Sequence, residues 1–294
     1  MKKSVSAFMA IVIALVYFLA GCSAKDVEYT EHQNLIKKEI DFSDDVLRFD
    51  LKEAGLTDVF VRDKTVTSVL VQEDIFAQVY LIADDRYGGN MGTSDHYLML
   101  VIDDKIILHD LAIGESMARM GGHIEVQDFD GDGYKEILLQ ESSGMTGGFG
   151  QYVSRVFKYV NGEIKMIFSS YVKDGEYFDT GFSCVVLENY NLRINNRFTG
   201  YSEIFNYRDV KSSWYKENEH TDYSSQLLVD SFYDFEACDV DGDGVYEIVG
   251  YQYTSIAGHT DYVGSAKTTL KYDKEKGEFV VSDAEFIRCE SKEK

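Results

Sequence analysis

The sequence predicts an all-β protein built from repeated four-stranded units, and three observations support this prediction. Short segments rich in Val, Ile, Tyr and Phe are separated by Gly, Asn or Asp roughly every ten residues, which is typical of all-β domains. One acidic, glycine-containing loop occurs twice. No long helical periodicity interrupts the segments after residue 57. We therefore expect units that stack radially or as a solenoid.

The composition is that of a globular protein with a strong acidic excess. The chain has 294 residues, of which 45% are hydrophobic and 14% aromatic, and its formal net charge is -22. This length and apolar content suffice for one large domain or two small ones with a substantial core. The charge argues against nucleic acid as a partner, because phosphate binding requires basic surfaces. The chain lacks proline, so its turns must rely on Gly, Asn and Asp.

The N-terminal residues predict export and lipid attachment. An unbroken apolar run at residues 7–20 has the length of a signal-peptide core and is short for a membrane-spanning helix. The Leu-Ala-Gly-Cys sequence at residues 19–22 resembles the bacterial lipobox. This resemblance implies a signal peptide at residues 1–21 and a lipidated, commonly palmitoylated Cys22 that anchors the chain to the membrane, on the extracytoplasmic side of the bacterial cell envelope. An ordinary signal peptide with a chance cysteine is the alternative.

The next residues predict a tether that leads into the β-domain. Residues 22–42 are highly charged and contain the spacing of a helix-capping box. Residues 43–56 fit either a short helix that stops at Gly55 or a strand, and we favour the helix. The β-domain is expected to occupy residues 43–294.

Three cysteines remain once Cys22 is assigned to lipid. Cys184, Cys238 and Cys289 cannot form a disulfide framework, and their wide spacing matches no zinc site. We expect either one disulfide and one thiol, or three buried thiols.

The repeated acidic loop has the ligand spacing of a calcium site. Its copies are VQDFDGDGYKEILLQ at residues 126–140 and ACDVDGDGVYEIVGY at residues 237–251. Positions 1, 3 and 5 of each loop are Asp, position 6 is Gly, position 9 is Glu, and the position-7 carbonyl adds an oxygen. Alternate carboxylates point inward in such a turn, and Gly permits the backbone reversal. The expected ligands of two structural calcium ions are Asp128, Asp130, Asp132, Tyr134 and Glu136, and Asp239, Asp241, Asp243, Val245 and Glu247.

The EF-hand has a related spacing, but the sequence departs from it twice. Position 12 is Leu139 or Gly250 instead of Glu, and each loop is followed by a strand pattern. The loops instead resemble the calcium loops of FG-GAP/VCBS repeats in integrin-type β-propellers. The Phe-Gly and Gly-Ala-Pro sequences that name the FG-GAP family are missing, and Glu replaces the family's usual Asp at position 9. The resemblance implies a β-propeller of about five blades, up to seven. Two metal-free Asp/Gly turns are the alternative.

The surroundings of the loops are also repeated, with a unit of about 56 residues that suits a four-stranded blade. The copies from Glu136 and Glu247 each comprise a strand, a Gly-rich loop, a long strand with a tyrosine and a Gly-Glu turn. A third copy without the acidic loop begins at Val79, and a degenerate copy is expected near residue 192.

Three Gly-rich loops occupy one place in these copies, at residues 86–92, 142–151 and 255–264. None has the pattern of a nucleotide-binding loop. They are either flexible hairpin tips or the rim of a ligand-binding face. The rim candidates are Gly88, Gly89, Gly147, Gly148 and His259.

We find no catalytic motif in the sequence. Residues 114–118 approach the serine-hydrolase elbow but end in Ala and lack the α/β context. The histidines show no metal-ligand spacing. We therefore predict a non-catalytic module that binds a protein or glycan at the cell envelope. An extracellular polysaccharide-acting hydrolase or lyase on a propeller scaffold is the alternative, as is a scaffolding subunit of a lipoprotein complex.

Overall fold

The computed structural model describes most of the chain between residues 51 and 289. The described residues are 51–56, 59–65, 67–84, 95–103, 105–111, 122–142, 152–173, 176–207, 227–256 and 262–289. They all belong to a compact unit that spans Ile40–Lys294. No helix among them has the length and apolar content that a membrane crossing requires. The predicted signal peptide, tether and lipidated Cys22 lie outside them, as do the rim candidates Gly88, Gly89, Gly147, Gly148 and His259.

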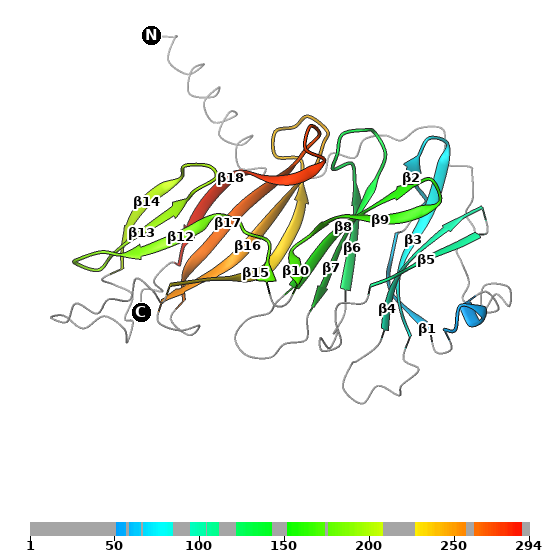
Figure 1. The fold of residues 1–294 in the computed structure, drawn as a ribbon, viewed down its shortest axis with the longest axis horizontal. Helices are drawn as coiled ribbons and strands as arrows, with labels where there is room; N and C mark the ends of the chain where they lie inside the picture. Colours follow the sequence, from blue (N-terminus) through cyan, green and yellow to red (C-terminus); the bar gives the residue numbers. More distant parts are fainter. Residues whose placement is uncertain are drawn as a thin grey trace, which may run out of the picture. The chain divides into compact units, whose positions relative to one another are not determined.

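The described part of the chain is all-β, as predicted, and its first sheet has five antiparallel strands (Figure 1). The strands of this N-terminal sheet are β1 (Val59–Lys64), β2 (Val69–Gln72), β3 (Ile75–Asp84), β4 (Asp95–Ile102) and β5 (Lys105–Asp110). The sheet order is β1-β3-β4-β5, and β2 pairs with β3. The sequence copy that begins at Val79 corresponds to the β3–β4–β5 part of this sheet.

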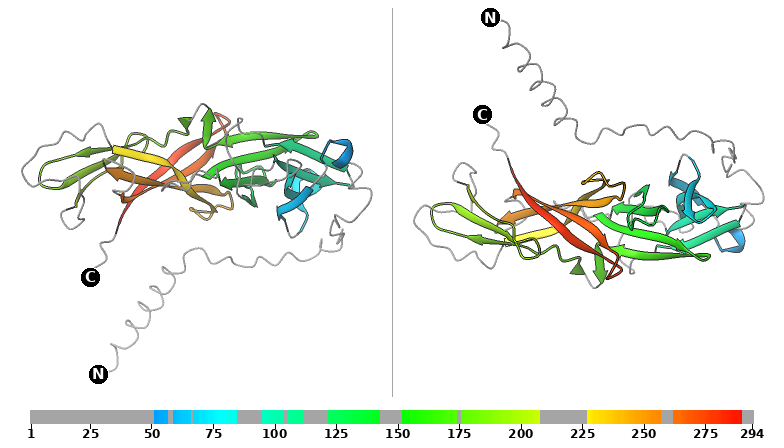
Figure 2. Two further views of the ribbon diagram at one scale, coloured as in Figure 1. Left: turned by 90° about the horizontal axis from the view of Figure 1, so that it is seen from below. Right: turned by 90° about the horizontal axis from the view of Figure 1, so that it is seen from above.

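Two four-stranded antiparallel sheets contain the acidic loops. The middle sheet consists, in sheet order, of β6 (Gly122–Gln127), β7 (Glu136–Ser142), β8 (Tyr152–Val160) and β9 (Glu163–Ser169). The C-terminal sheet consists, in sheet order, of β15 (Leu227–Cys238), β16 (Glu247–Ile256), β17 (Tyr262–Asp273) and β18 (Glu278–Arg288). Figure 2 shows how these last strands, yellow to red, fan out with the twist that is usual in antiparallel sheets. Both acidic loops thus join the first strand of a sheet to the second.

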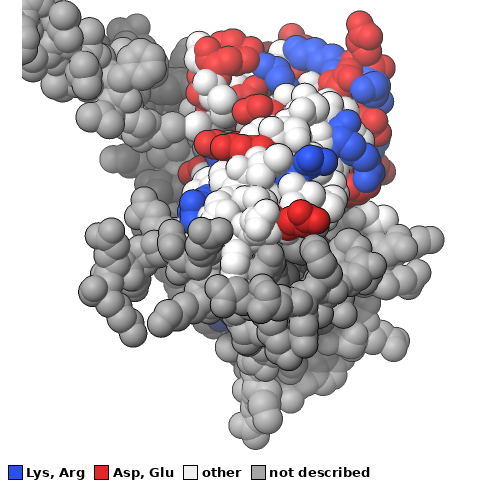
Figure 3. Space-filling view, turned by 90° about the vertical axis from the view of Figure 1, so that its left-hand side faces the viewer, with Lys and Arg blue, Asp and Glu red and all other residues white. Residues whose placement is uncertain are grey.

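Two smaller sheets lie between these meanders in the sequence. The two-stranded one pairs β10 (Tyr171–Lys173) with β11 (Glu176–Tyr177), and the three-stranded one contains β12 (Phe182–Val186), β13 (Asn191–Asn196) and β14 (Ser202–Asn206). The strand–loop–strand pattern near residue 192 corresponds to β13 and β14. Seen from the side on which β12–β14 lie in Figure 1, the described surface has charged side chains of both signs around an uncharged middle (Figure 3). The acidic excess of the chain is therefore not gathered into one patch on this face.

Strand β7 is buried on both faces, which explains its uninterrupted apolar sequence. Ile137 and Leu139 belong to a core that includes Leu81 and Leu98 of the N-terminal sheet. Leu138 points to the opposite face and belongs to a core shared with the C-terminal sheet. Each fully buried Leu or Ile side chain stabilises the fold by about 1.5–3 kcal/mol. The middle sheet therefore packs against both of its neighbours.

A third core lies between the three-stranded sheet and the C-terminal sheet. It contains Leu192 and Ile194 of β13 together with Phe286 of β18. Cys184 also packs here, and burial raises the pKa of its thiol to about 12, so it behaves as a small apolar residue. The structure contains Cys184, Cys238 and Cys289 as thiols, of which Cys184 alone is buried.

The described end of the segment at residues 43–56 is helical, in agreement with the interpretation that we favoured. Residues 51–53 are helical, and Gly55 has a φ of 84°. The N–H of Leu56 donates to the carbonyl of Leu51, and the N–H of Gly55 donates to that of Lys52, both at 2.9 Å. These two bonds form a Schellman motif, in which a left-handed Gly ends the helix. Leu51 and Leu56 then pack on the N-terminal sheet.

Gly122 at the start of β6 allows the middle sheet to approach the N-terminal sheet closely. A methyl group at this position would lie 2.4 Å from Leu81 Cδ2 and 3.2 Å from the carbonyl oxygen of Gln140. We therefore expect Gly122→Ala to lower the free energy of unfolding by about 1–3 kcal/mol through overpacking. Urea denaturation followed by tyrosine fluorescence measures this change.

A double-mutant cycle with Leu81→Ala provides the control for this prediction. Removal of the Leu81 side chain makes room for the added methyl group, so the penalty of Gly122→Ala should shrink in the Leu81→Ala background. An equal penalty in both backgrounds would show that the contact with Leu81 is not the cause.

Candidate metal centre

The first acidic loop comprises residues 128–136 and turns sharply between β6 and β7. Gly131 and Gly133 have φ values of 69° and 89°. In the second acidic loop, residues 239–247, Gly242 and Gly244 have φ values of 76° and 86°. A β-carbon is strained in this region, which is why both loops use Gly at positions 4 and 6. The reversal expected at position 6 is present in both loops.

Aspartate side chains fold the first loop around themselves. Asp128 Oδ1 accepts from the N–H of Gly131 at 2.7 Å, and Asp128 Oδ2 accepts from the N–H of Gly133 at 2.9 Å. Asp132 Oδ1 accepts from the N–H of Tyr134 at 2.9 Å. These side-chain-to-backbone bonds satisfy N–H groups that the turn cannot pair with other backbone atoms.

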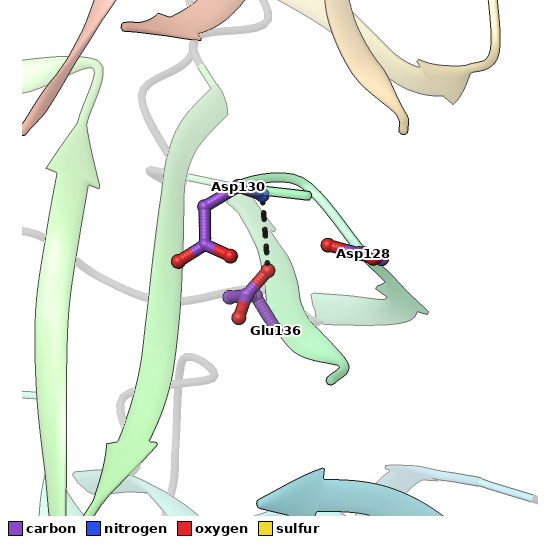
Figure 4. A group of neighbouring side chains, drawn as sticks. All are labelled: Asp128, Asp130 and Glu136. Atoms are coloured by element: carbon purple, nitrogen blue, oxygen red, sulfur yellow. Dashed lines mark hydrogen bonds between the residues drawn. The ribbon is translucent and has the colours of Figure 1, made fainter. Parts of the chain in front are cut away.

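Glu136, the first residue of β7, connects the end of the first loop to its beginning. Its side chain is fully buried, and Oε2 accepts from the N–H of Phe129 at 2.9 Å and from that of Asp130 at 3.3 Å. Figure 4 shows the bond to Asp130 and the carboxylates of Asp130 and Glu136 next to each other. The position-9 Glu therefore reaches the loop, as its spacing predicts.

A lysine from a neighbouring strand reaches into the first loop. Lys158 on β8 places its Nζ 2.6 Å from Asp132 Oδ2 and 3.2 Å from Glu136 Oε1, and it also donates to Asp130 Oδ2. Three carboxylates therefore converge on one ammonium group. The side chain of Lys158 occupies the place at which a bound cation would balance these charges.

The second loop repeats these bonds with equivalent atoms. Asp239 Oδ2 accepts from the N–H of Gly244 at 3.2 Å. Asp243 Oδ1 accepts from the N–H of Val245 at 2.8 Å. Glu247 Oε2 accepts from the N–H of Val240 at 3.0 Å. Two segments of the chain that differ in sequence thus form the same turn.

A lysine also reaches into the second loop from the equivalent strand. Lys271 on β17 places its Nζ 2.8 Å from Asp241 Oδ2, 3.0 Å from Glu247 Oε1 and 3.5 Å from Asp243 Oδ2. Sequence analysis missed both lysines. A signal was present, because each stands in an apolar-Lys-Tyr triplet on the third strand of its sheet, at residues 157–159 and 270–272.

The loops gather oxygen atoms closely enough to hold a metal ion. In each loop, the acids at positions 1, 3 and 9 offer oxygens that all lie within 4.8 Å of one another. Buried carboxylate oxygens without a hydrogen-bond partner, among the described residues, include Oε1 of Glu136, Oε1 of Glu247 and Oδ1 of Asp239. A hard, oxygen-only donor set of this kind suits calcium. The position-5 acids, Asp132 and Asp243, do not belong to these clusters, although they contact the lysines as well.

One ammonium group does not neutralise the first loop. Burial and the neighbouring charge of Asp130 raise the pKa of Glu136 to about 7. Burial opposes ionisation of Asp132, but bonds from Lys158 and from the N–H of Tyr134 outweigh it and lower the pKa of this carboxyl. Burial likewise disfavours the charge of Lys158, yet Asp130 and Asp132 raise its pKa. Burial is the larger cause of the raised pKa of Glu136, and the negative charge of Asp130 adds to it.

Both loops also contact the preceding sheet, through the backbone of position 8. The N–H of Lys135 donates to the carbonyl of Leu70 in β2 at 2.8 Å, and the N–H of Tyr246 donates to the carbonyl of Asp128 at 2.8 Å. Lys274 Nζ adds a bond of 2.9 Å to the carbonyl of Gly131. The two acidic loops are thus directly connected, and each joins its own sheet to the one before it.

Comparison with known families gives one match. The sequence model of the YybI C-terminal domain matches residues 181–287, which run from the start of the three-stranded sheet to the end of β18. The matched segment contains the second loop and Lys271 but neither the first loop nor Lys158. No curated protein matches the chain.

A second polar cluster, which sequence analysis also missed, lies at the opposite end of β7. Glu141 Oε1 is 2.7 Å from His96 Nδ1, and Glu141 Oε2 is 3.3 Å from Arg155 Nη2. Arg155 Nη1 donates to the carbonyl of Leu111 at 3.2 Å. All three side chains are buried, and their mutual pairing offsets the cost of removing these polar groups from water. The cluster links the N-terminal sheet to the middle sheet, and no sequence spacing connects its members.

Removal of the position-1 acid should affect the two loops unequally. Asp128 is buried and accepts two backbone bonds, whereas Asp239 is half-buried and accepts one by Oδ2. We expect Asp128→Ala to lower the free energy of unfolding by about 2–4 kcal/mol and Asp239→Ala by about 1 kcal/mol. Urea denaturation in EDTA measures both. Equal losses would contradict this difference, and Asp128→Asn, which keeps one acceptor, should fall between Asp128→Ala and the parent.

Proposed function

We propose that this chain is a non-catalytic, protein- or glycan-binding module of the bacterial cell envelope whose β-scaffold is stabilised by calcium at its two acidic loops. The observation that carries this proposal is the duplicated geometry of the loops. The same aspartates, glycines and glutamate form the same turn twice, and each turn stands where one sheet contacts the preceding one. A cation at such a turn would stabilise the contact between the sheets.

The chemistry of the loops favours calcium over other ions. Their donors are carboxylate oxygens, which softer metals do not select. Among the buried oxygens without hydrogen bonds, Asp239 Oδ1 is available as a ligand, while Glu136 Oε1 and Glu247 Oε1 face lysine ammonium groups that a calcium ion would replace. Extracellular modules commonly bind calcium with dissociation constants of about 10⁻⁴–10⁻³ M, which suits the extracytoplasmic location that the lipobox at Cys22 predicts.

We further propose that the four-stranded sheets are blades of an FG-GAP/VCBS-type β-propeller, anchored through lipid on Cys22. Two features support this architecture. The acidic loops join the first and second strands of their sheets, and the Gly-rich segments join the second and third strands. The Gly-rich segments of different sheets thus leave from the same strand ends, where they would gather at one face and bind the partner.

Calcium should raise the melting temperature of the protein. At about 10 mM calcium and a dissociation constant of about 0.1–1 mM, binding at one loop adds about 1.4–2.7 kcal/mol of stability. For a domain of this size, the melting temperature should therefore rise by roughly 3–10 °C relative to EDTA. Differential scanning calorimetry in EDTA, calcium and magnesium measures the shift.

The control variants separate calcium binding from a general effect of ions. Asp241→Ala removes a predicted ligand of the second loop and should abolish the part of the calcium shift that this loop contributes. Asp283→Ala, an exposed position on β18 with the same change in charge, should keep it. Superimposable melting curves of the parent protein in EDTA and in calcium would refute the proposed role of calcium.

A further inference from the structure

Each acidic loop is already balanced in part by a lysine of its own sheet, and the two lysines differ in their surroundings. The side chain of Lys158 is 18% exposed, and that of Lys271 is 37% exposed. The position-3 carboxylate beside Lys158, Asp130, is 10% exposed, whereas its counterpart Asp241 is 53% exposed. The ammonium group is thus sheltered in the first loop and open to water in the second.

The backbone of the first loop, which surrounds Lys158, is held by several hydrogen bonds. Both carboxylate oxygens of Asp128 are occupied by backbone N–H groups of the loop. The carbonyls of Asp128 and Gly131 are held by Tyr246 and Lys274. These bonds, within the loop and between the two loops, hold the backbone that carries the carboxylates around the Lys158 ammonium group.

The second loop has an oxygen atom that Lys271 does not contact and that a calcium ion could use as a ligand. Asp239 Oδ1 and Glu247 Oε1 are buried without a hydrogen bond, and Glu247 is 2% exposed. Lys271 satisfies Glu247 by an ionic contact of 3.0 Å and leaves Asp239 Oδ1 without one. A calcium ion, which requires six to eight oxygen ligands, can use this additional oxygen, while an ammonium group with three N–H donors does not.

We propose that Lys158 and Lys271 are intramolecular competitors of calcium, and that millimolar calcium displaces Lys271 but not Lys158. This inference rests on the proposed calcium binding and narrows it, in the parent chain, to the second loop. In the first loop, the Lys158 ammonium group stays bound to the carboxylates whether or not calcium is present. The second loop is the exchangeable site, in which lysine holds the turn when calcium is scarce and moves into solvent when calcium binds.

Isothermal titration of the full chain in detergent with calcium chloride tests this assignment. The parent should bind one calcium ion. Lys158→Met should bind two, because its first loop loses the competing cation. Lys271→Met should still bind one ion, with an affinity about tenfold higher than that of the parent, as expected when an exposed ionic competitor is lost. Lys267→Met is the matched control, since Lys267 lies on β17 and pairs with Glu285 outside the loop; it should titrate like the parent.

The outcomes separate this inference from the proposed function. Two equivalent sites in the parent, unchanged by either Lys→Met substitution, would overturn the competition and leave the calcium proposal standing. No binding to any variant would overturn both. If circular dichroism shows that Lys158→Met does not fold, Lys271→Met decides the question, and an affinity equal to that of the parent overturns the proposal.

Discussion

The convergence of several carboxylates on one small volume is the constraint on which this structure depends. Each acidic loop brings Asp and Glu side chains together at the root of a strand, and such a cluster repels itself unless a cation is present. In the first loop, the ammonium of Lys158 supplies part of that charge, while burial and the charge of Asp130 raise the pKa of Glu136. The backbone of the turn depends on the same carboxylates, because their oxygens accept hydrogen bonds from its N–H groups. The same carboxylates therefore determine both the fold of the loop and its charge balance.

The position of the loops gives this local problem wider consequences. Strand β7 begins at the first loop with Glu136 and ends near Glu141, and between them it packs against both neighbouring sheets. The first loop bonds to Leu70 on one side and accepts a bond from Tyr246 on the other. A change in the cation at a loop is thus positioned to alter how two sheets meet. For this reason we interpret the acidic loops as structural contacts between sheets rather than as a catalytic site.

The local features of the site could be predicted from the sequence because they depend on short spacings. Asp at alternate positions, Gly133 and Gly244 at the reversal, and Glu136 and Glu247 at the following strand all act within nine residues. The lysines could not be assigned in this way, because Lys158 meets its loop only through the pairing of β7 with β8. The His96–Glu141–Arg155 cluster depends on contacts between sheets, for which the sequence has no periodicity. Strands β15 and β18 carry polar residues that interrupt the apolar pattern of the other strands, so their bounds are harder to predict.

Amide hydrogen exchange at Tyr246 tests the central claim most directly, because the N–H of this residue joins the second loop to the first. The parent and Asp128→Ala should be compared by NMR in EDTA, with the amides of β17 reporting global unfolding. If the carboxylates hold this contact, Asp128→Ala should accelerate exchange at Tyr246 by a larger factor than it does in β17. Equal acceleration at Tyr246 and in β17 would contradict the account, because the loop would then add only to global stability.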